Sequence, residues 1–168
     1  LRTTYFQHIE KLFSNNDMLN ATAQILDDIF MHLHSFAGAT FNEDAEKSIL
    51  AQGELMSTNM MTNFLQEQGY DVVLLPALEF MRTDKNAEPD LVYIKNKLGA
   101  QLEMHPDADI YITQGYICRN AYGEVDNLQR GGSDYSASLI GAAANASEIQ
   151  IWTDIDGMHD NDPRIVEK

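Results

Sequence analysis

An arginine, two glycines, a serine and an aspartate follow one another in this chain, and these residue types suit the binding of an anion. Gly131 and Gly132 leave backbone amides uncovered, and the sequence after them predicts a helix, whose N-terminus attracts negative charge. Arg130 adds a guanidinium that can hold a carboxylate or a phosphate through two hydrogen bonds. Ser133 and Asp134 also suit a helix N-cap and a first-turn acid, and this local role is compatible with ligand binding.

A second polar segment begins at Asp154, directly after a strand that we predict over residues 148–153. A glycine turn, then a helix, then a strand with a polar end is the order in which open α/β proteins form a nucleotide crevice. The acidic residues of this segment also suit a solvated turn, and we expect some of them to be only that. A calcium loop starting at Asp154 fits poorly, because Met158, His159 and Ile165 would occupy its key positions.

The elements that must position these residues follow from hydrophobic periodicity and from the turn residues. The first part of the chain is helical, and the rest alternates strands with helices. The strand over residues 110–118 is apolar enough to be covered on both faces of a sheet. The predicted helices span residues 2–14, 19–37, 42–68, 91–104 and 133–144; the strands span 72–75, 110–118 and 148–153; the loops span 83–89 and 120–132.

Composition excludes several classes of protein. The net charge is −15, with 11 Lys and Arg against 26 Asp and Glu, which argues against binding to nucleic acids or to membrane surfaces. The single cysteine, Cys118, cannot form an internal disulfide, so a reducing cytoplasm is the expected setting. Its apolar surroundings predict a buried, inert thiol. Met56, Met60 and Met61 are expected to be core residues.

Four segments together resemble the aspartokinases, enzymes of the amino-acid kinase fold. They are GELMST at residues 53–58, YITQGYI at 111–117, RGGSDYSASLIGAA at 130–143 and IQIWTDIDGMHDNDPRIVEK at 149–168. The resemblance covers about residues 48–168, and it is specific because the motifs occur in this order. It implies an α/β fold, a three-layer αβα sandwich that is incomplete here and has a helical N-terminal part.

The resemblance also implies a reaction and its participants. An aspartokinase transfers the γ-phosphoryl group of ATP to the side-chain carboxylate of L-aspartate, with Mg²⁺, at the start of lysine, threonine and methionine synthesis. The full-length enzyme is expected to be a homo-oligomer that binds neither nucleic acid nor membrane. The resemblance assigns substrate contact to Glu54, Arg130, Gly131, Gly132, Ser133 and Asp134, with Asp134 also catalytic, and nucleotide contact to Thr153, Asp154, His159, Asp162 and Arg164; no residue is assigned to a metal.

The chain is expected to be one partial domain over residues 1–168, the central part of the kinase domain. The family's opening segment, KFGGTS, and its C-terminal ligand-sensing domains are not in this sequence. The sequence departs from the family at His159, where a number of relatives carry Tyr, at residues 126–129, where many relatives have a Thr-rich run, and at Cys118, where Gly is common. Two alternatives stay open: a kinase for glutamate, acetylglutamate or a nucleotide, and, for this chain alone, a non-catalytic fragment or dimerising module.

Overall fold

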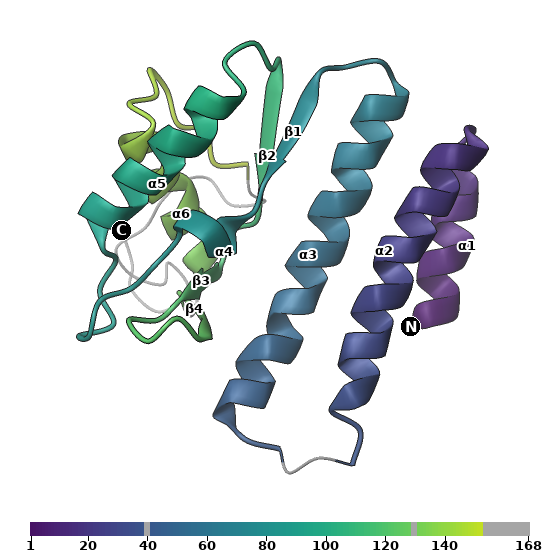
Figure 1. The fold of residues 1–168 in the computed structure, drawn as a ribbon, viewed down its shortest axis with the longest axis horizontal. Helices are drawn as coiled ribbons and strands as arrows, with labels where there is room; N and C mark the ends of the chain where they lie inside the picture. The colour runs from purple at the N-terminus through teal and green to yellow at the C-terminus, as the bar shows by residue number, and fades with distance from the viewer. Residues whose placement is uncertain (39–40, 129–130, 153–168) are drawn as a thin grey trace, which may run out of the picture.

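A computed structural model describes residues 1–38, 41–128 and 131–152 of the chain. These residues form a mixed α/β fold that is largely helical and contains two small sheets (Figure 1). Three long helices lie on one side of the ribbon, and the strands with the remaining helices lie on the other. The predicted succession of helices followed by an α/β part is therefore confirmed.

The helical side consists of α1 (Arg2–Leu12), α2 (Asn16–Ser35) and α3 (Glu43–Glu67). The side-chain oxygen of Asn15 accepts a hydrogen bond from the Asp17 amide at 2.8 Å, so α2 begins three residues earlier than predicted. Asn42 caps α3 in the same way through the Ala45 amide. A buried cluster of Ile9, Phe13, Leu26 and Met56 joins the three helices.

Only part of the methionine prediction is confirmed. Met56 is buried and Met60 packs against the same cluster, but Met61 is 52% exposed, so its placement in the core was wrong. Five residues along an α-helix rotate the side chain by about 140°. Met61 therefore faces away from the neighbours that enclose Met56.

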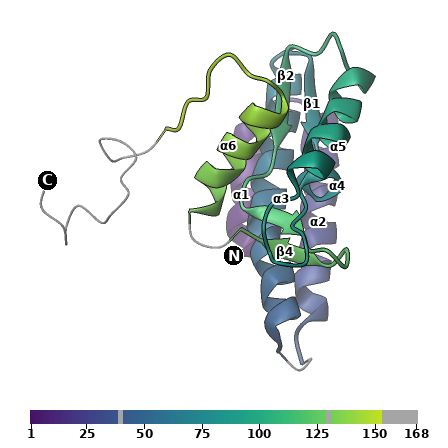
Figure 2. The same cartoon turned by 90° about the vertical axis from the view of Figure 1, so that its left-hand side faces the viewer.

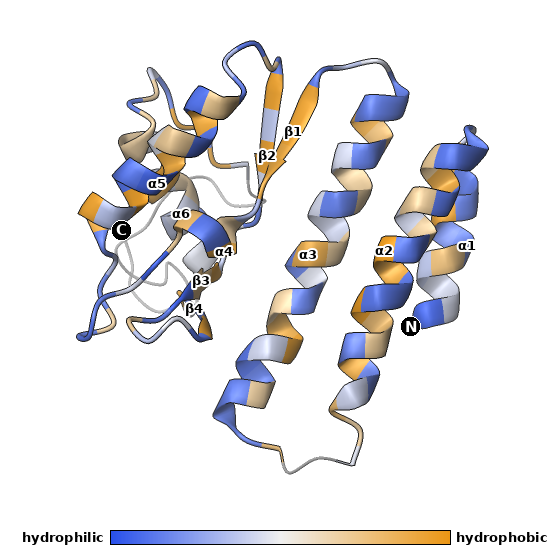
Figure 3. Cartoon of the chain, viewed as in Figure 1, coloured by the Kyte–Doolittle hydropathy of each residue, from blue (hydrophilic) through white to orange (hydrophobic). Residues whose placement is uncertain are grey.

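The first sheet pairs β1 (Val72–Leu75) with β2 (Ile110–Thr113) in parallel, and Figure 3 shows β1 hydrophobic along its length. The chain between the two strands forms α4 (Ala77–Phe80) and α5 (Leu91–Met104), as a parallel crossover requires. The bounds of α5 agree with the prediction. The sequence did not reveal α4, because four residues are too few to show a helical period.

The predicted strand over residues 110–118 is in fact two strands in different sheets, so this prediction was wrong. β2 stops at Thr113, and β3 (Ile117–Arg119) pairs antiparallel with β4 (Val125–Asn127). Tyr116 between them has a φ of +68°, which no strand residue adopts. The Tyr116 amide donates to the Ser136 hydroxyl at 2.9 Å, and this bond holds the break in place.

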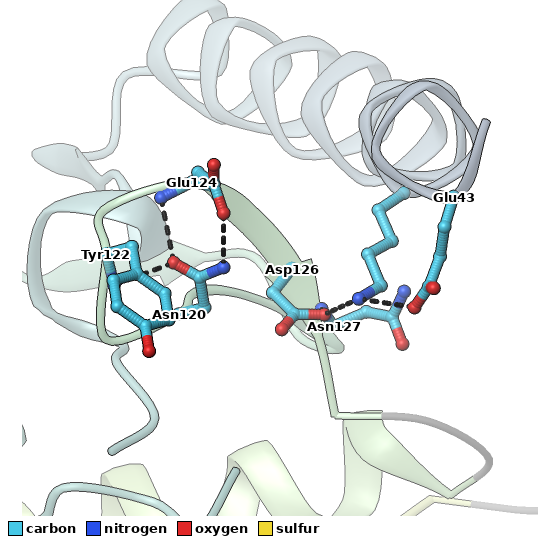
Figure 4. A network of polar contacts seen from close by, with 7 residues as sticks. Glu43, Asn120, Tyr122, Glu124, Asp126 and Asn127 are labelled. Carbon is cyan, nitrogen blue, oxygen red and sulfur yellow. Dashed lines mark hydrogen bonds and ion pairs between the residues drawn. The ribbon is translucent and has the colours of Figure 1, made fainter. Parts of the chain in front are cut away.

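The segment predicted as an irregular loop, residues 120–132, contains β4 and is partly a hairpin. The side-chain oxygen of Asn120 accepts hydrogen bonds from the Tyr122 and Glu124 amides, and Figure 4 shows these contacts closing the turn. Gly123 in the turn has a φ of +85°, a conformation that favours glycine. The polar composition suggested a loop because the turn residues outnumber the strand residues.

The chain then forms α6 (Gly132–Ala143), which packs with α5 around Leu139, Ile94 and Leu98. The strand predicted over residues 148–153 was wrong for its described part, since residues 148–152 belong to no strand. Figure 2 shows residues 144–152 leading away from the sheets, and Trp152 is 90% exposed. An apolar segment becomes a strand only when it pairs with another strand, and in the described part of the chain this segment pairs with none.

Candidate functional site

The glycine turn lies at the N-terminus of α6, as the sequence predicted. Gly131 is the N-cap with a φ of +77°, and the helix begins at Gly132, one residue earlier than expected. A Cβ on Gly132 would lie 3.0 Å from both the Tyr116 ring and Leu128 Cβ, so only glycine fits there without a shift. Ser133 and Asp134 are exposed in the first turn. Amides and exposed side chains here are placed where an anion would bind.

The first turn of α6 is fixed against the break between β2 and β3. Gly115 lies so close to α6 that an added Cβ would be 3.2 Å from Ser133 Cα. The buried Ser136 hydroxyl donates to the Gly132 carbonyl at 2.6 Å and accepts from Tyr116. The glycine turn is therefore held by the end of a sheet strand.

The GELMST segment on α3 contacts the same break between β2 and β3, through Gln114. Glu54 is half-buried, and the Thr58 hydroxyl one turn later accepts a hydrogen bond of 2.8 Å from the Gln114 side chain. Gln114 directly precedes Gly115, which packs on Ser133. The structure thus connects two motifs that are more than seventy residues apart in the sequence.

Both connections are made just beyond the carboxyl ends of β1 and β2. Gln114 follows β2, and its side-chain oxygen accepts a hydrogen bond of 2.8 Å from the Ala77 amide, which follows β1. In open α/β sheets, ligands bind in the crevice outside these strand ends. Glu54 and the turn at Gly131–Asp134, two of the predicted site segments, therefore lie on elements that both contact the residues directly after β2.

A cavity of about 780 Å³ adjoins this region, between the start of α3, the turn at residues 83–89, and β4. Tyr116 and Tyr135 line it near α6. Its single described cation, Lys47, donates to Glu43 at 2.9 Å and to Asp126 at 3.1 Å. These hydrogen bonds hold the pKa of Lys47 above its ordinary value.

Sequence reasoning missed the Lys47 network. The four-residue spacing from Glu43 to Lys47 is a signal for a pair on one helix face. Nothing in the sequence indicates that Asp126, on a hairpin strand far along the chain, joins it. The part of the structure described here contains no group of three or more His, Cys, Asp or Glu side chains that could hold a metal.

The remaining predicted site residues lie outside the described residues. They are Arg130 in the predicted substrate-binding set and Thr153, Asp154, His159, Asp162 and Arg164 in the predicted nucleotide-binding set. Cys118 is fully buried, as predicted, and burial raises the pKa of its thiol to about 12. In the described ranges, no helix has the length and apolar character needed to cross a membrane.

The chain belongs to a known family of proteins. The chain matches the amino acid kinase family over residues 6–168, nearly its whole length, and it is a member of that family. Among curated proteins it is similar to lysine-sensitive aspartokinase 3 of Escherichia coli K12, with 32% identity over 99% of this chain and 37% of the relative. It is also similar to the aspartokinase of Chlamydia muridarum, with 35% identity over 80% of this chain and 31% of the relative.

Solved structures show the same relationship. The crystal structure of E. coli aspartokinase III in complex with aspartate and ADP matches 94% of this chain and 36% of that chain, with a TM-score of 0.76 and 31% identity. The same enzyme in complex with lysine and aspartate matches 98% of this chain with a TM-score of 0.78. The chain spans about a third of the length of these relatives.

Proposed function

We propose that this chain is the central part of the catalytic domain of an aspartokinase, which converts ATP and L-aspartate to ADP and 4-phospho-L-aspartate. The observation that carries the proposal is the meeting of the GELMST segment with the first turn of α6 through Gln114 and Gly115. The crystal structure of E. coli aspartokinase III with aspartate and ADP supports it, because this chain matches that fold over 94% of its length.

Aspartate offers one ammonium and two carboxylates, and the residues proposed to contact it divide accordingly. Glu54 on α3 is proposed to receive the ammonium, and Arg130 with the amides of Gly131 and Gly132 to hold a carboxylate. Ser133 is proposed to contact the substrate, and Asp134 both to contact it and to orient a cationic group. An oxygen of the bound side-chain carboxylate then attacks the γ-phosphorus, and the bond to the leaving oxygen of ADP breaks.

The nucleotide is proposed to bind through the segment after α6. Thr153 and Asp154 would lie against adenine and ribose, His159 would stack nearby, and Arg164, with Asp162, would reach a phosphate. Mg²⁺ would bind together with the phosphate oxygens of ATP, as is usual for this ion. Mg²⁺ supplies charge neutralisation for the transferring phosphoryl group.

The finer architecture is part of the same proposal. We propose that the complete domain is a three-layer αβα sandwich in which β1 and β2 are two strands of a larger sheet. The complete protein, called the parent protein below, is proposed to be a cytoplasmic homo-oligomer. Another amino-acid kinase activity is the second candidate, and the GELMST segment together with the RGGSDY segment favours aspartate over it.

The activity is tested in the parent protein by ATP-dependent formation of aspartyl hydroxamate with aspartate and Mg²⁺. Glutamate, acetylglutamate and nucleoside monophosphates are offered in parallel, and turnover of one of these in place of aspartate would assign the second candidate. The isolated chain of 168 residues is expected to show no turnover, because 11 Lys and Arg against 26 Asp and Glu leave little positive charge for two anionic substrates.

Arg130→Lys tests the carboxylate contact. Lysine cannot make the planar two-point contact of a guanidinium, so the KM for aspartate should rise at least tenfold, and the KM for ATP should change much less. Arg2→Lys is the matched control, because Arg2 lies on α1 and pairs with Asp27 on the exposed surface. Unchanged constants for Arg130→Lys would remove Arg130 from the site.

A further inference from the structure

A buried glutamine connects the elements that carry the two substrate-binding motifs. Gln114 is only 1% exposed, although it stands directly before the glycine that packs on α6. Its side-chain oxygen accepts from the Ala77 amide at 2.8 Å, and its side-chain nitrogen donates to the Thr58 hydroxyl at 2.8 Å. A buried amide without such partners would be costly, so both bonds hold it in one orientation.

The Thr58 hydroxyl continues this connection into α3. It accepts from Gln114 and donates to the Glu54 carbonyl at 2.7 Å, so its proton is committed to the turn that carries Glu54. A continuous series of hydrogen bonds therefore runs from the Ala77 amide, at the end of β1, through Gln114 and Thr58 to the backbone of Glu54.

The same glutamine fixes the position of the other motif through the chain itself. Gly115 is covalently next to Gln114 and lies against Ser133, so close that an added Cβ would be 3.2 Å from Ser133 Cα. A shift of Gln114 would therefore move α3 and the first turn of α6 relative to each other. These elements carry the groups proposed to hold opposite ends of aspartate.

We propose that Gln114, acting through Thr58, is a positioning residue that sets the separation between Glu54 and the N-terminus of α6, and hence the affinity for the amino-acid substrate. The proposal rests on the proposed aspartokinase function. A substrate held at two ends requires both anchors in register, and a misplacement of about 1 Å can reduce the rate a hundredfold. ATP is proposed to bind through other segments, so its binding should depend little on Gln114.

The test is the steady-state kinetics of the parent protein with Thr58→Val, which keeps the side-chain shape and removes the hydroxyl. The KM for aspartate should rise roughly tenfold, as expected for a displacement smaller than 1 Å, and the KM for ATP should stay within about twofold. Thr58→Ser restores the hydroxyl and should return the KM for aspartate to near the wild-type value. Gln114→Met, which removes both bonds with little change in volume, should reproduce the effect of Thr58→Val.

Thr22→Val is the matched control for a purely structural effect. The Thr22 hydroxyl accepts from the Asn63 side chain at 2.9 Å and donates to the Met18 carbonyl at 2.8 Å, so it repeats the chemistry of Thr58 in the helical part. This variant should lose stability without a change in either KM.

Two outcomes would overturn the positioning proposal alone. One is a wild-type KM for aspartate in folded Thr58→Val and Gln114→Met, and the other is an equal rise in both KM values, which would indicate a distortion of the whole site. A wild-type parent protein that does not phosphorylate aspartate would instead overturn the proposed function, and the positioning proposal with it.

Discussion

The ammonium nitrogen of Lys47 lies 3.1 Å from a carboxylate oxygen of Asp126 and thereby joins α3 to the hairpin strand β4. The Lys47 side chain is 24% exposed and that of Asp126 is 17% exposed, so solvent screens this pair only in part. Lys47 also contacts Glu43, whose side chain is 78% exposed. One lysine therefore makes one sheltered and one open ion pair.

Asp126→Asn should lower the free energy of unfolding by about 1–2 kcal/mol, between the values typical of exposed and of buried pairs that lose one partner. Glu43→Gln should lower it by at most about 0.5 kcal/mol, because its pair is exposed. Urea denaturation of both variants measures the difference. Equal losses would show that Lys47 does not discriminate between its two carboxylates.

Substitution by alanine should have opposite effects on stability at Gly99 and at Gly115. Gly99 on α5 has open space where a Cβ would be, so Gly99→Ala should stabilise the protein by about 0.5–1 kcal/mol through helix propensity. Gly115→Ala would place its Cβ 3.2 Å from Ser133 Cα, which is backbone held in a helix. It should destabilise by about 1–3 kcal/mol. Thermal melts report both signs, and stabilisation by Gly115→Ala would contradict the close approach.

The buried thiol predicts a dependence on alkaline pH. Burial raises the pKa of Cys118 to about 12, from an ordinary value of 9.0. The unfolded chain therefore releases the thiol proton at a lower pH than the folded chain does. The resulting stability is fully present below pH 9 and is lost as pH rises from about 9 towards 12.

The reaction of Cys118 with Ellman's reagent at pH 8 measures whether its thiol is buried. The native protein should react slowly, at a rate limited by opening of the structure, and the urea-unfolded protein should react at once. Cys118→Ala should flatten the fall in stability between pH 9 and 11 relative to wild type. Rapid reaction of the native thiol would contradict its burial.

The sequence was sufficient to predict the structure of segments whose conformation is determined by their own residues. The period of α5 and the glycine turn before α6 were correct because local periodicity and glycine conformation act within a few residues. The family resemblance placed the GELMST and RGGSDY segments in one site, and the contacts through Gln114 are consistent with that placement.

The sequence was insufficient to predict segments whose conformation depends on contacts with residues far along the chain. Nothing in the run from Ile110 to Cys118 indicates that Tyr116 adopts a positive φ, because the Ser136 hydroxyl that holds this conformation lies on another element. The segment at residues 148–152 has a strand-like composition but pairs with no strand in the described structure. The pairing of Lys47 with Asp126 similarly depends on the docking of β4 against α3.

Helix α3 contributes to two separate clusters of buried side chains. Ala51 and Leu55 pack into the cluster around the sheets, whereas Met56 and Phe64 pack into the cluster between the three long helices. Neither cluster can lose α3 and keep its apolar surface covered, so the two parts should unfold in a single cooperative transition. A destabilising change at Leu26, far from the strands, would then weaken hydrogen-exchange protection in β1 as well as in α2.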